Sequence, residues 1–370
     1  MTISLFVFLM RTATTKHVSQ LCMCAFLMCS ISCFASSHGG NLSLYSHTYS
    51  SPAPIKQFIE SFEGDSVGRG DITFTHNRAE VDYTFRNVHI GAITRYDYWV
   101  GFSQDTVQTV FEAENDLPIG SDIARDIFLD INHNQSKGIN IAYSFKPLVG
   151  LSITPKFQFY QSESILFGQL DGVLTIDEQE NISGELRLDY VYNADVIFDR
   201  EPQLFDGRGW GVDLEVDWQI NAQIHLNYIL LDGLNQFTFE QATFTQAVLN
   251  SNRIRVNQSG VLDVNPALIG FEGEKTVKQR LPSRSFGHMA YRPNKYVSFD
   301  VRRERFGAEV FMQAGSTIYL GGFLAALLYQ PKGEAYSFSL RYKDVGVSVV
   351  TDNSDYEQAH ILGVHINLKY

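Results

Sequence analysis

The chain has 370 residues, of which 44% are hydrophobic and 13% aromatic, and its mean hydropathy is −0.11. Its formal net charge of −12 argues against nucleic acid or an anionic lipid surface as a partner. Beyond the first 34 residues no apolar run is long enough for a transmembrane helix. A soluble β-sandwich and a membrane barrel of alternating strands would share these totals, so strand length has to distinguish them.

The first 35 residues are predicted to be a secretory signal peptide. Arg11 and Lys16 precede the apolar run Leu21–Phe34, and the small residue Ala35 follows it. A basic start, an apolar run and small residues at the cleavage point are the parts of such a leader. Met10 is an alternative start, because a leader beginning there has ordinary proportions.

All four cysteines lie in this leader: Cys22, Cys24, Cys29 and Cys33. The mature chain therefore has no disulfide, thiol nucleophile or thiolate metal site. Lipidation at Cys33 is not favoured, because Ser30 stands where a lipoprotein signal has an aliphatic residue. The leader holds two of the 29 basic residues and no acidic one, so the mature net charge is −14.

Residues 36–70 are expected to form a separate segment before the first strand. Ile55, Phe58, Ile59 and Phe62 recur with helical spacing. Two placements are open: a plug inside the lumen, or a helix that covers the periplasmic rim.

Two motifs suggest chemistry without supporting it. Gly64–Gly68 (GDSVG) matches GxSxG, but a nucleophile elbow follows a strand and precedes a helix, and here an apparent helix comes first. Asp130–Ser136 spaces oxygen atoms like a calcium loop, but Gln135 replaces the turn glycine and the twelfth position has no Glu. The first motif is therefore interpreted as a glycine turn and the second as a polar loop tip. No catalytic residue, metal site or cofactor is predicted.

Ser103–Gly138 is expected to be an outer loop with two helices, one through Val107 and Phe111 and one over Ile123–Ile127. It either folds inward as a constriction or buries its own apolar residues.

Trp210–Ile220 is the clearest predicted strand. Its apolar side is predicted to face lipid, with a Trp near each interface: Trp210, Val212, Leu214, Val216 and Trp218. Its other side is predicted to line the lumen: Asp213, Glu215 and Asp217.

The neighbouring strands are predicted to add more polar residues to the lumen. Gln223–Leu230 contributes His225, and Gly184–Ala194 contributes Glu185, Arg187 and Asp189. These side chains either set solute selectivity or fill the barrel with an ion-pair network.

The connections are expected to alternate between short periplasmic turns and long outer loops. The predicted turns are 343–344, 313–316, 292–295, 221–222, 177–181 and 146–150. Leu231–Pro282 is predicted to be the largest outer feature. The result is an all-β, antiparallel up-and-down transmembrane barrel of 14–16 strands, spanning residues 71–370.

The chain ends in an alternating strand, Ala359–Tyr370. It resembles the C-terminal signature of bacterial outer-membrane β-barrel proteins, in which alternating apolar residues close on Tyr or Phe. The resemblance implies a Gram-negative outer-membrane location and an assembly signal read by the barrel-assembly machinery: Tyr370, Leu368 and Ile366.

Two functions remain open from the sequence. The first is a passive channel or transporter for small polar or cationic solutes. The second is an accessory barrel with a plugged lumen that anchors a secretion, polysaccharide or surface-assembly complex through its loops. An integral hydrolase lacks a nucleophile–base pair. Membrane lipid is an expected partner, and a protein partner is expected only in the second case.

Overall fold

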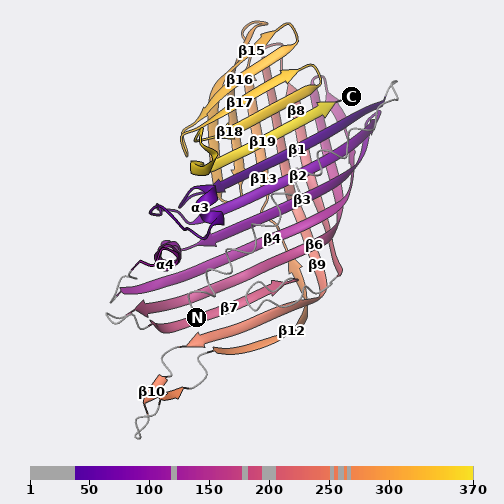
Figure 1. Cartoon of the computed structure of the whole chain (residues 1–370). Coiled ribbons are helices and arrows are strands. Elements are labelled where there is room, and N and C mark those ends of the chain that lie inside the picture. Colours follow the sequence, from indigo (N-terminus) through magenta and orange to yellow (C-terminus); the bar gives the residue numbers. More distant parts are fainter. Residues whose placement is uncertain are drawn as a thin grey trace.

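The computed structural model describes residues 38–117, 123–176, 182–193, 206–250, 254–256, 262–264 and 268–369. They form an antiparallel sheet that closes on itself as an up-and-down barrel with 14 strand positions (Figure 1). The predicted fold class is confirmed. The leader (1–35) and Tyr370 lie outside the described residues.

Fourteen strands form the wall. In spatial order they are β1 (His38–Ser50), β2 (Ile72–Phe85), β3 (Val88–Phe102), β4 (Ile123–Tyr143), β6 (Leu151–Ile176), β8 (Asp206–Gln219), β9 (Ile224–Asn250), β13 (Arg284–Tyr291), β14 (Val297–Phe306), β15 (Glu309–Leu320), β16 (Phe323–Gln330), β17 (Ala335–Tyr342), β18 (Val345–Thr351) and β19 (Ile361–Lys369). The other elements are α3 (Ile55–Ile59), α4 (Gln104–Glu114), β5 (Phe145–Leu148), β7 (Ile182–Tyr192), β10 (Ile254–Val256), β11 (Leu262–Val264), β12 (Leu268–Gln279) and the 3-10 turn η2 (Tyr356–Gln358).

Part of the sheet continues beyond the barrel. β6 and β9 have 26 and 27 residues, whereas about ten residues cross a membrane. The first half of each pairs with β8, and the second half of each pairs with β7. β12 and β13 likewise pair with successive parts of β9. We call β7, β12 and the far halves of β4, β6 and β9 the extension. β7 and β12 lie at its lower end in Figure 1.

The two ends of the barrel differ in their connections. At the end where β19 finishes, every connection is short, and those at 86–87, 321–322 and 343–344 have only two residues. Gly321 and Gly322 both have positive φ, which the twisted two-residue turn between antiparallel strands requires. We call this end the short-turn rim and the opposite end, with the connections 51–71 and 352–360, the loop rim.

Several predicted boundaries differ from the structure. Residues 313–316 lie inside β15, and the strand ends flanking 177–181 lie at the loop-rim end of β6 and β7. Residues 123–136 belong to β4, so they form neither a second helix nor a polar loop tip. Short apolar runs fit helical and strand periodicity about equally well, which explains the second helix.

The barrel begins at His38, whereas the sequence placed its start at residue 71. β1 pairs with β2 on one side and with β19 on the other, from Asn41–Lys369 to Tyr49–Ile361. The outward positions of β1 change from Leu to Ser and Thr along the strand, so its alternation is weak in the sequence. The described part of this predicted segment, 38–70, is therefore not a plug, because 38–50 form a wall strand and α3 follows that strand at the loop rim.

The two helices lie against the outer face of the wall near the loop rim. Ile139 and Ile141 of β4 are exposed on that face. β4 contains no extra residue that would interrupt its alternation. Ile127, Leu129 and Ile131 therefore lie on the same face as Ile139 and Ile141. There they are buried in one cluster with residues of α3 and α4: Phe58, Phe62, Val107 and Val110. α4 therefore lies outside the lumen and does not constrict it.

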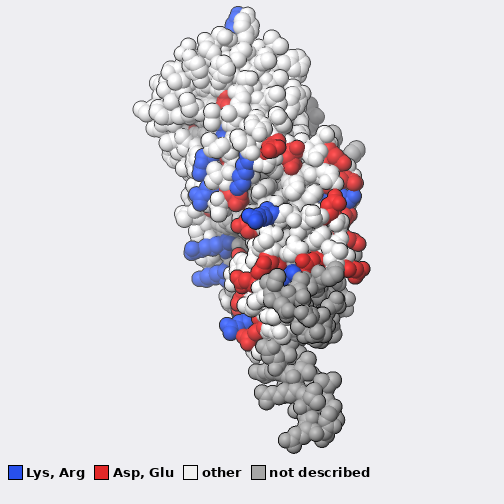
Figure 2. Space-filling model, turned by 90° about the vertical axis from the view of Figure 1, so that its left-hand side faces the viewer, with Lys and Arg blue, Asp and Glu red and all other residues white. Residues whose placement is uncertain are grey.

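A broad outer surface carries few charges. On the face shown in Figure 2, the upper part of the molecule, which holds β15–β18, is almost free of charged residues, whereas the part below it is rich in them. On β17 the exposed residues alternate with buried Ser337 and Ser339, and they are Tyr336, Phe338, Leu340 and Tyr342. Such a belt is what a lipid-facing barrel wall presents. Among the described residues no helix is long and apolar enough to span a membrane.

Candidate functional site

The structure places the three acids of β8 on the lumen side. Asp213, Glu215 and Asp217 line one internal cavity. Trp210 and Trp218 point the other way, with 43% and 37% of their surfaces exposed. His225 of β9 is also directed inward, and its Nε2 lies 2.8 Å from Asp217 Oδ2.

The three charged residues predicted on Gly184–Ala194 do not line this cavity. Glu185, Arg187 and Asp189 lie on β7, in the extension, and are largely exposed. Glu185 accepts a hydrogen bond from Arg187 Nη2 at 3.0 Å. Strand alternation alone could not show that β7 lies beyond β8 rather than beside it, because only the pairing of β6 with both strands fixes that.

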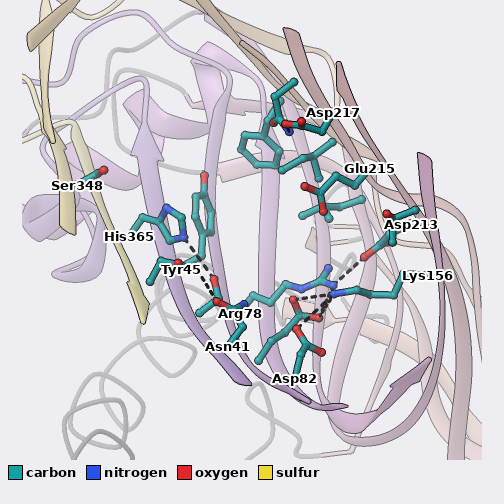
Figure 3. Close-up of a pocket in the computed structure, with 18 of the residues that line it drawn as sticks. Asn41, Tyr45, Arg78, Asp82, Lys156, Asp213, Glu215, Asp217, Ser348 and His365 are labelled. Carbon is teal, nitrogen blue, oxygen red and sulfur yellow. Dashed lines mark hydrogen bonds and ion pairs between the residues drawn. The ribbon is translucent and has the colours of Figure 1, made fainter. Parts of the chain in front are cut away.

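The cavity has a volume of about 920 Å³ and lies in the short-turn half of the barrel (Figure 3). It reaches strand ends at the short-turn rim, including Gly39 and Lys369. Its lining contains six carboxylate side chains and four from Lys or Arg. We call it the cup.

The inward face of β2 shows what lies between the cup and the loop rim. From the loop rim downward it carries Phe74, His76, Arg78, Glu80 and Asp82. Only the last three line the cup. From the loop rim to the short-turn rim, the lumen is therefore filled first by aromatic rings and then by charged side chains, and it finally opens into the cup.

Ion pairs connect opposite walls at the charged level. Arg95 of β3 forms a two-pronged contact with Asp232 of β9, at 2.7 and 2.8 Å. Arg284 of β13 binds Asp232 at 2.9 Å and Asp97 of β3 at 2.7 Å. Arg78 of β2 binds Asp213 of β8 at 2.7 Å. We call this network the cross-lumen staple.

The staple shows that the barrel is flattened at this level. Three wall strands, β4, β6 and β8, separate β3 from β9. In a circular barrel of 14 strands, about 28 Å across, two strands four steps apart would be separated by about 22 Å, more than one Arg–Asp pair can span. The charges are held without water because each is paired: the side chains of Arg95 and Asp232 have no exposed surface.

A β-bulge directs Asp232 into the lumen. The pairing of β8 with β9 shifts between Val212 and Leu214, and Asp232 there has a φ of 55°. Its backbone N–H donates to Asp213 Oδ1 at 2.8 Å, which links the two acids. Bulges commonly turn a side chain toward a functional position.

A layer of aromatic rings closes the lumen between the staple and the loop rim. Phe74 of β2 stacks on Phe306 of β14 with centroids 4.8 Å apart, although these strands lie on opposite sides of the barrel. Tyr49 meets Phe311 edge to face at 5.1 Å. Trp99 also stacks on Phe74, with centroids 5.3 Å apart. Among the described residues the cup is therefore closed on its loop-rim side.

Sequence reasoning missed the staple. One of its members carried a readable signal, since Arg78 and the neighbouring inward residue His76 alternate with smaller or apolar residues on β2. Asp232 and Arg284 lie at the edges of the segment that the sequence assigned to an outer loop, so their inward direction depends on pairings far along the chain.

The remaining motifs do not build a second site. Gly64–Gly68 lies between α3 and β2 and has no strand before it. Asp130–Ser136 is extended within β4. The described residues include no group of His, Asp and Glu that could hold a metal ion.

No protein-family model matches the chain, and no curated protein matches it in sequence. Among solved structures, the Pseudomonas putida toluene transporter TodX is 10% identical, with a TM-score of 0.42 over 91% of this chain and 88% of its own. A Pseudomonas aeruginosa FadL homologue is 10% identical, with a TM-score of 0.38 over 91% and 90%. A variant of the Rh. blastica porin is 9% identical, with a TM-score of 0.25 over 90% and 99%. The structural neighbours are thus outer-membrane barrel channels, and the barrel assignment above rests on this chain's own strand pairings.

Proposed function

We propose that the protein is an outer-membrane channel or transporter that admits small polar or cationic solutes into the cup and releases them when the cross-lumen staple opens. The observation that carries the proposal is the cup itself. It is a cavity of about 920 Å³, reached from one rim and closed toward the other by side chains of the wall.

The charges of the cup support a preference for cations. Glu80 accepts hydrogen bonds from Arg78, at 2.8 Å, and from Lys156, at 3.3 Å, so both basic side chains already have an acidic partner. Glu215 has no ion pair among the described residues and lies at the cup surface (Figure 3). An uncompensated carboxylate in a narrow aqueous space attracts cations and hydrogen-bond donors.

The closed lumen is compatible with transport because its barrier is made of side chains. No separate domain has to leave the barrel, and the barrier consists of paired charges and stacked rings on strands that remain in the wall. Separation of the two walls by the length of these contacts would join the cup to the loop rim.

The test is conductance in planar bilayers, comparing wild type with the double variant Arg95→Gln/Asp232→Asn. Wild type should show rare openings, and the double variant frequent ones. In the opened variant, Glu215→Gln should move the reversal potential in a salt gradient toward lower cation preference. The control is Glu185→Gln, which neutralises an acid in the extension and should leave the reversal potential unchanged. A folded double variant that never conducts would refute transport through this lumen.

The same closure favours a second candidate, an accessory barrel that anchors a surface assembly. Its specific support is the extension, in which β4, β6 and β9 continue beyond the wall and pair with β7 and β12, and which offers a large surface for a partner. Absence of conductance in every folded variant, together with loss of a surface complex when 231–282 is shortened, would favour this function.

A further inference from the structure

The outer face of β14 changes from apolar to basic along its length. Phe299 and Val301 are exposed on this face, with 57% and 45% of their surfaces accessible. Arg303 and Arg305 follow on the same face and are also exposed. β14 has ten residues, about the number that crosses a membrane, so the two arginines lie at the loop-side edge of the apolar belt.

Neither arginine is neutralised by an acid. Gly287 and Met312 stand opposite Arg303 on the adjacent strands, and Ser285 stands opposite Arg305. Within the described part of the chain no ion pair involves Arg303 or Arg305. Among the residues that the structure describes, the single hydrogen bond of these two side chains runs from Arg305 Nε to Gly307 O, at 2.7 Å. Most guanidinium donors of the pair are therefore free to bind an anion.

The strand next to Arg303 carries no side chain at the same level. Gly287 pairs with Arg303 on one side and with Tyr228 on the other, and a Cβ at Gly287 would make an ordinary van der Waals contact with Tyr228 Cδ2, at 3.8 Å. Met289 follows on the same face toward the short-turn rim and is exposed, as Tyr228 is. Exposed apolar and aromatic side chains thus lie beside and below the two guanidinium groups.

We propose that this surface binds a lipid with a phosphate-bearing headgroup, with its acyl chain along Phe299 and Val301 and its phosphate on the two arginines that follow on the same face. Guanidinium groups bind phosphate oxygens in pairs, and long basic side chains at a membrane edge reach toward headgroups. A protein partner is disfavoured because the patch is continuous with the lipid-facing belt.

The net charge of −12 does not reveal this surface, since it averages over 41 acidic residues along the whole chain, including the six that line the cup. The inference rests on the outer-membrane placement proposed above, but it does not depend on whether the lumen conducts.

The test is native mass spectrometry of the full-length mature protein in a zwitterionic detergent. Phosphatidic acid and phosphatidylcholine with the same acyl chains are titrated separately. Wild type should retain phosphatidic acid preferentially, and the preference should fall about fivefold for each arginine removed, in Arg303→Gln and in Arg303→Gln/Arg305→Gln. Arg208→Gln is the matched control, because Arg208 is an exposed arginine on β8 already paired with Asp206 at 2.6 Å.

Heat-modifiable migration on gels confirms that each variant is folded, and Arg303→Lys serves if the double variant is not. That conservative variant keeps the charge but loses the paired donors, so it should retain part of the preference. Equal retention of the two lipids by wild type, or an unchanged preference in the folded variants, would overturn the proposal. Displacement of bound phosphatidic acid by inorganic phosphate alone would also overturn it, by showing a site for free anions. Failure to retain either lipid would instead refute the membrane placement.

Discussion

Removal of Arg95 tests the cross-lumen staple most directly. Its guanidinium makes two hydrogen bonds to Asp232 and one, of 2.6 Å, to Asp97. In Arg95→Gln the charge is lost while much of the side-chain volume stays. Asp232 then depends on Arg284, at 2.9 Å, as its remaining ionic partner.

The expected loss of stability follows from the burial of this pair. Removing one member of a buried ion pair costs about 3–5 kcal/mol, because the other charge stays away from water. Arg284 continues to neutralise Asp232, so we expect the lower end, about 3 kcal/mol. If the same contact holds the lumen closed, a loss of this size shifts the closed–open equilibrium by about 100-fold toward open.

Two measurements on the same preparations are needed. Urea-induced unfolding in lipid vesicles, followed by tryptophan fluorescence, gives the change in free energy of unfolding. Trp99 is a suitable reporter because it stacks on Phe74 in the adjacent aromatic layer. Single-channel recording gives the open fraction. Asp232→Asn and the double variant complete a thermodynamic cycle, in which the double variant should lose less stability than the sum of the single variants.

The control is Arg187→Gln, which breaks an exposed Arg–Glu pair in the extension and should cost about 0–1 kcal/mol. If Arg95→Gln matched this control in stability, the staple would not hold the walls together. If it were destabilised as expected but its open fraction were unchanged, the staple would be structural and would not act as a gate.

Three further predictions follow from the same structure. Phe338→Arg, on the outer face of β17, should cost about 2–4 kcal/mol in urea unfolding if that face meets the bilayer interior, and a cost below 1 kcal/mol would contradict the belt. A cysteine introduced at Tyr356, at the loop rim, should be labelled readily on intact cells by an impermeant reagent. A cysteine at Gly321, at the short-turn rim, should be labelled only after permeabilisation. The reverse result would invert the topology. The Lys56–Glu357 ion pair, at 2.9 Å, ties α3 to η2, and the hydrogen bond from Lys56 lowers the pKa of Glu357. The stabilisation of α3 by this ion pair is therefore present at neutral pH and is lost as the pH falls through that lowered pKa. Hydrogen-exchange protection of α3, corrected for intrinsic rates, should decline at acidic pH in wild type. In Glu357→Gln the protection should be low at every pH.

The sequence alone determined which face of a membrane-crossing strand meets lipid. On β8 and β17 strict alternation separates Trp and Tyr from Asp and Ser, and a slip of one residue would place acids in hydrocarbon. This local constraint acts within each strand, so it can be read without knowing the strand's neighbours. For the same reason the barrel class and a count near 14 strands were predictable.

Only the tertiary structure showed which alternating strands belong to the barrel wall and which lie beyond it. β7 alternates as regularly as β8, yet it lies in the extension, so its charged residues meet water and its apolar residues pack under α4. β1 alternates weakly, yet it closes the barrel, because its backbone pairs with β2 and β19 whatever its side chains. Neither distinction exists in a strand taken by itself.

The closure of the lumen also required the tertiary structure. Arg95 and Asp232 are 137 residues apart, and Phe74 and Phe306 lie still farther apart along the chain. They meet because the order of strands around the barrel places them on facing walls and a bulge turns Asp232 inward. Alternation shows that a charge faces a lumen, but only the closed wall determines which charge stands opposite, and therefore whether the lumen is an open path or a stapled one.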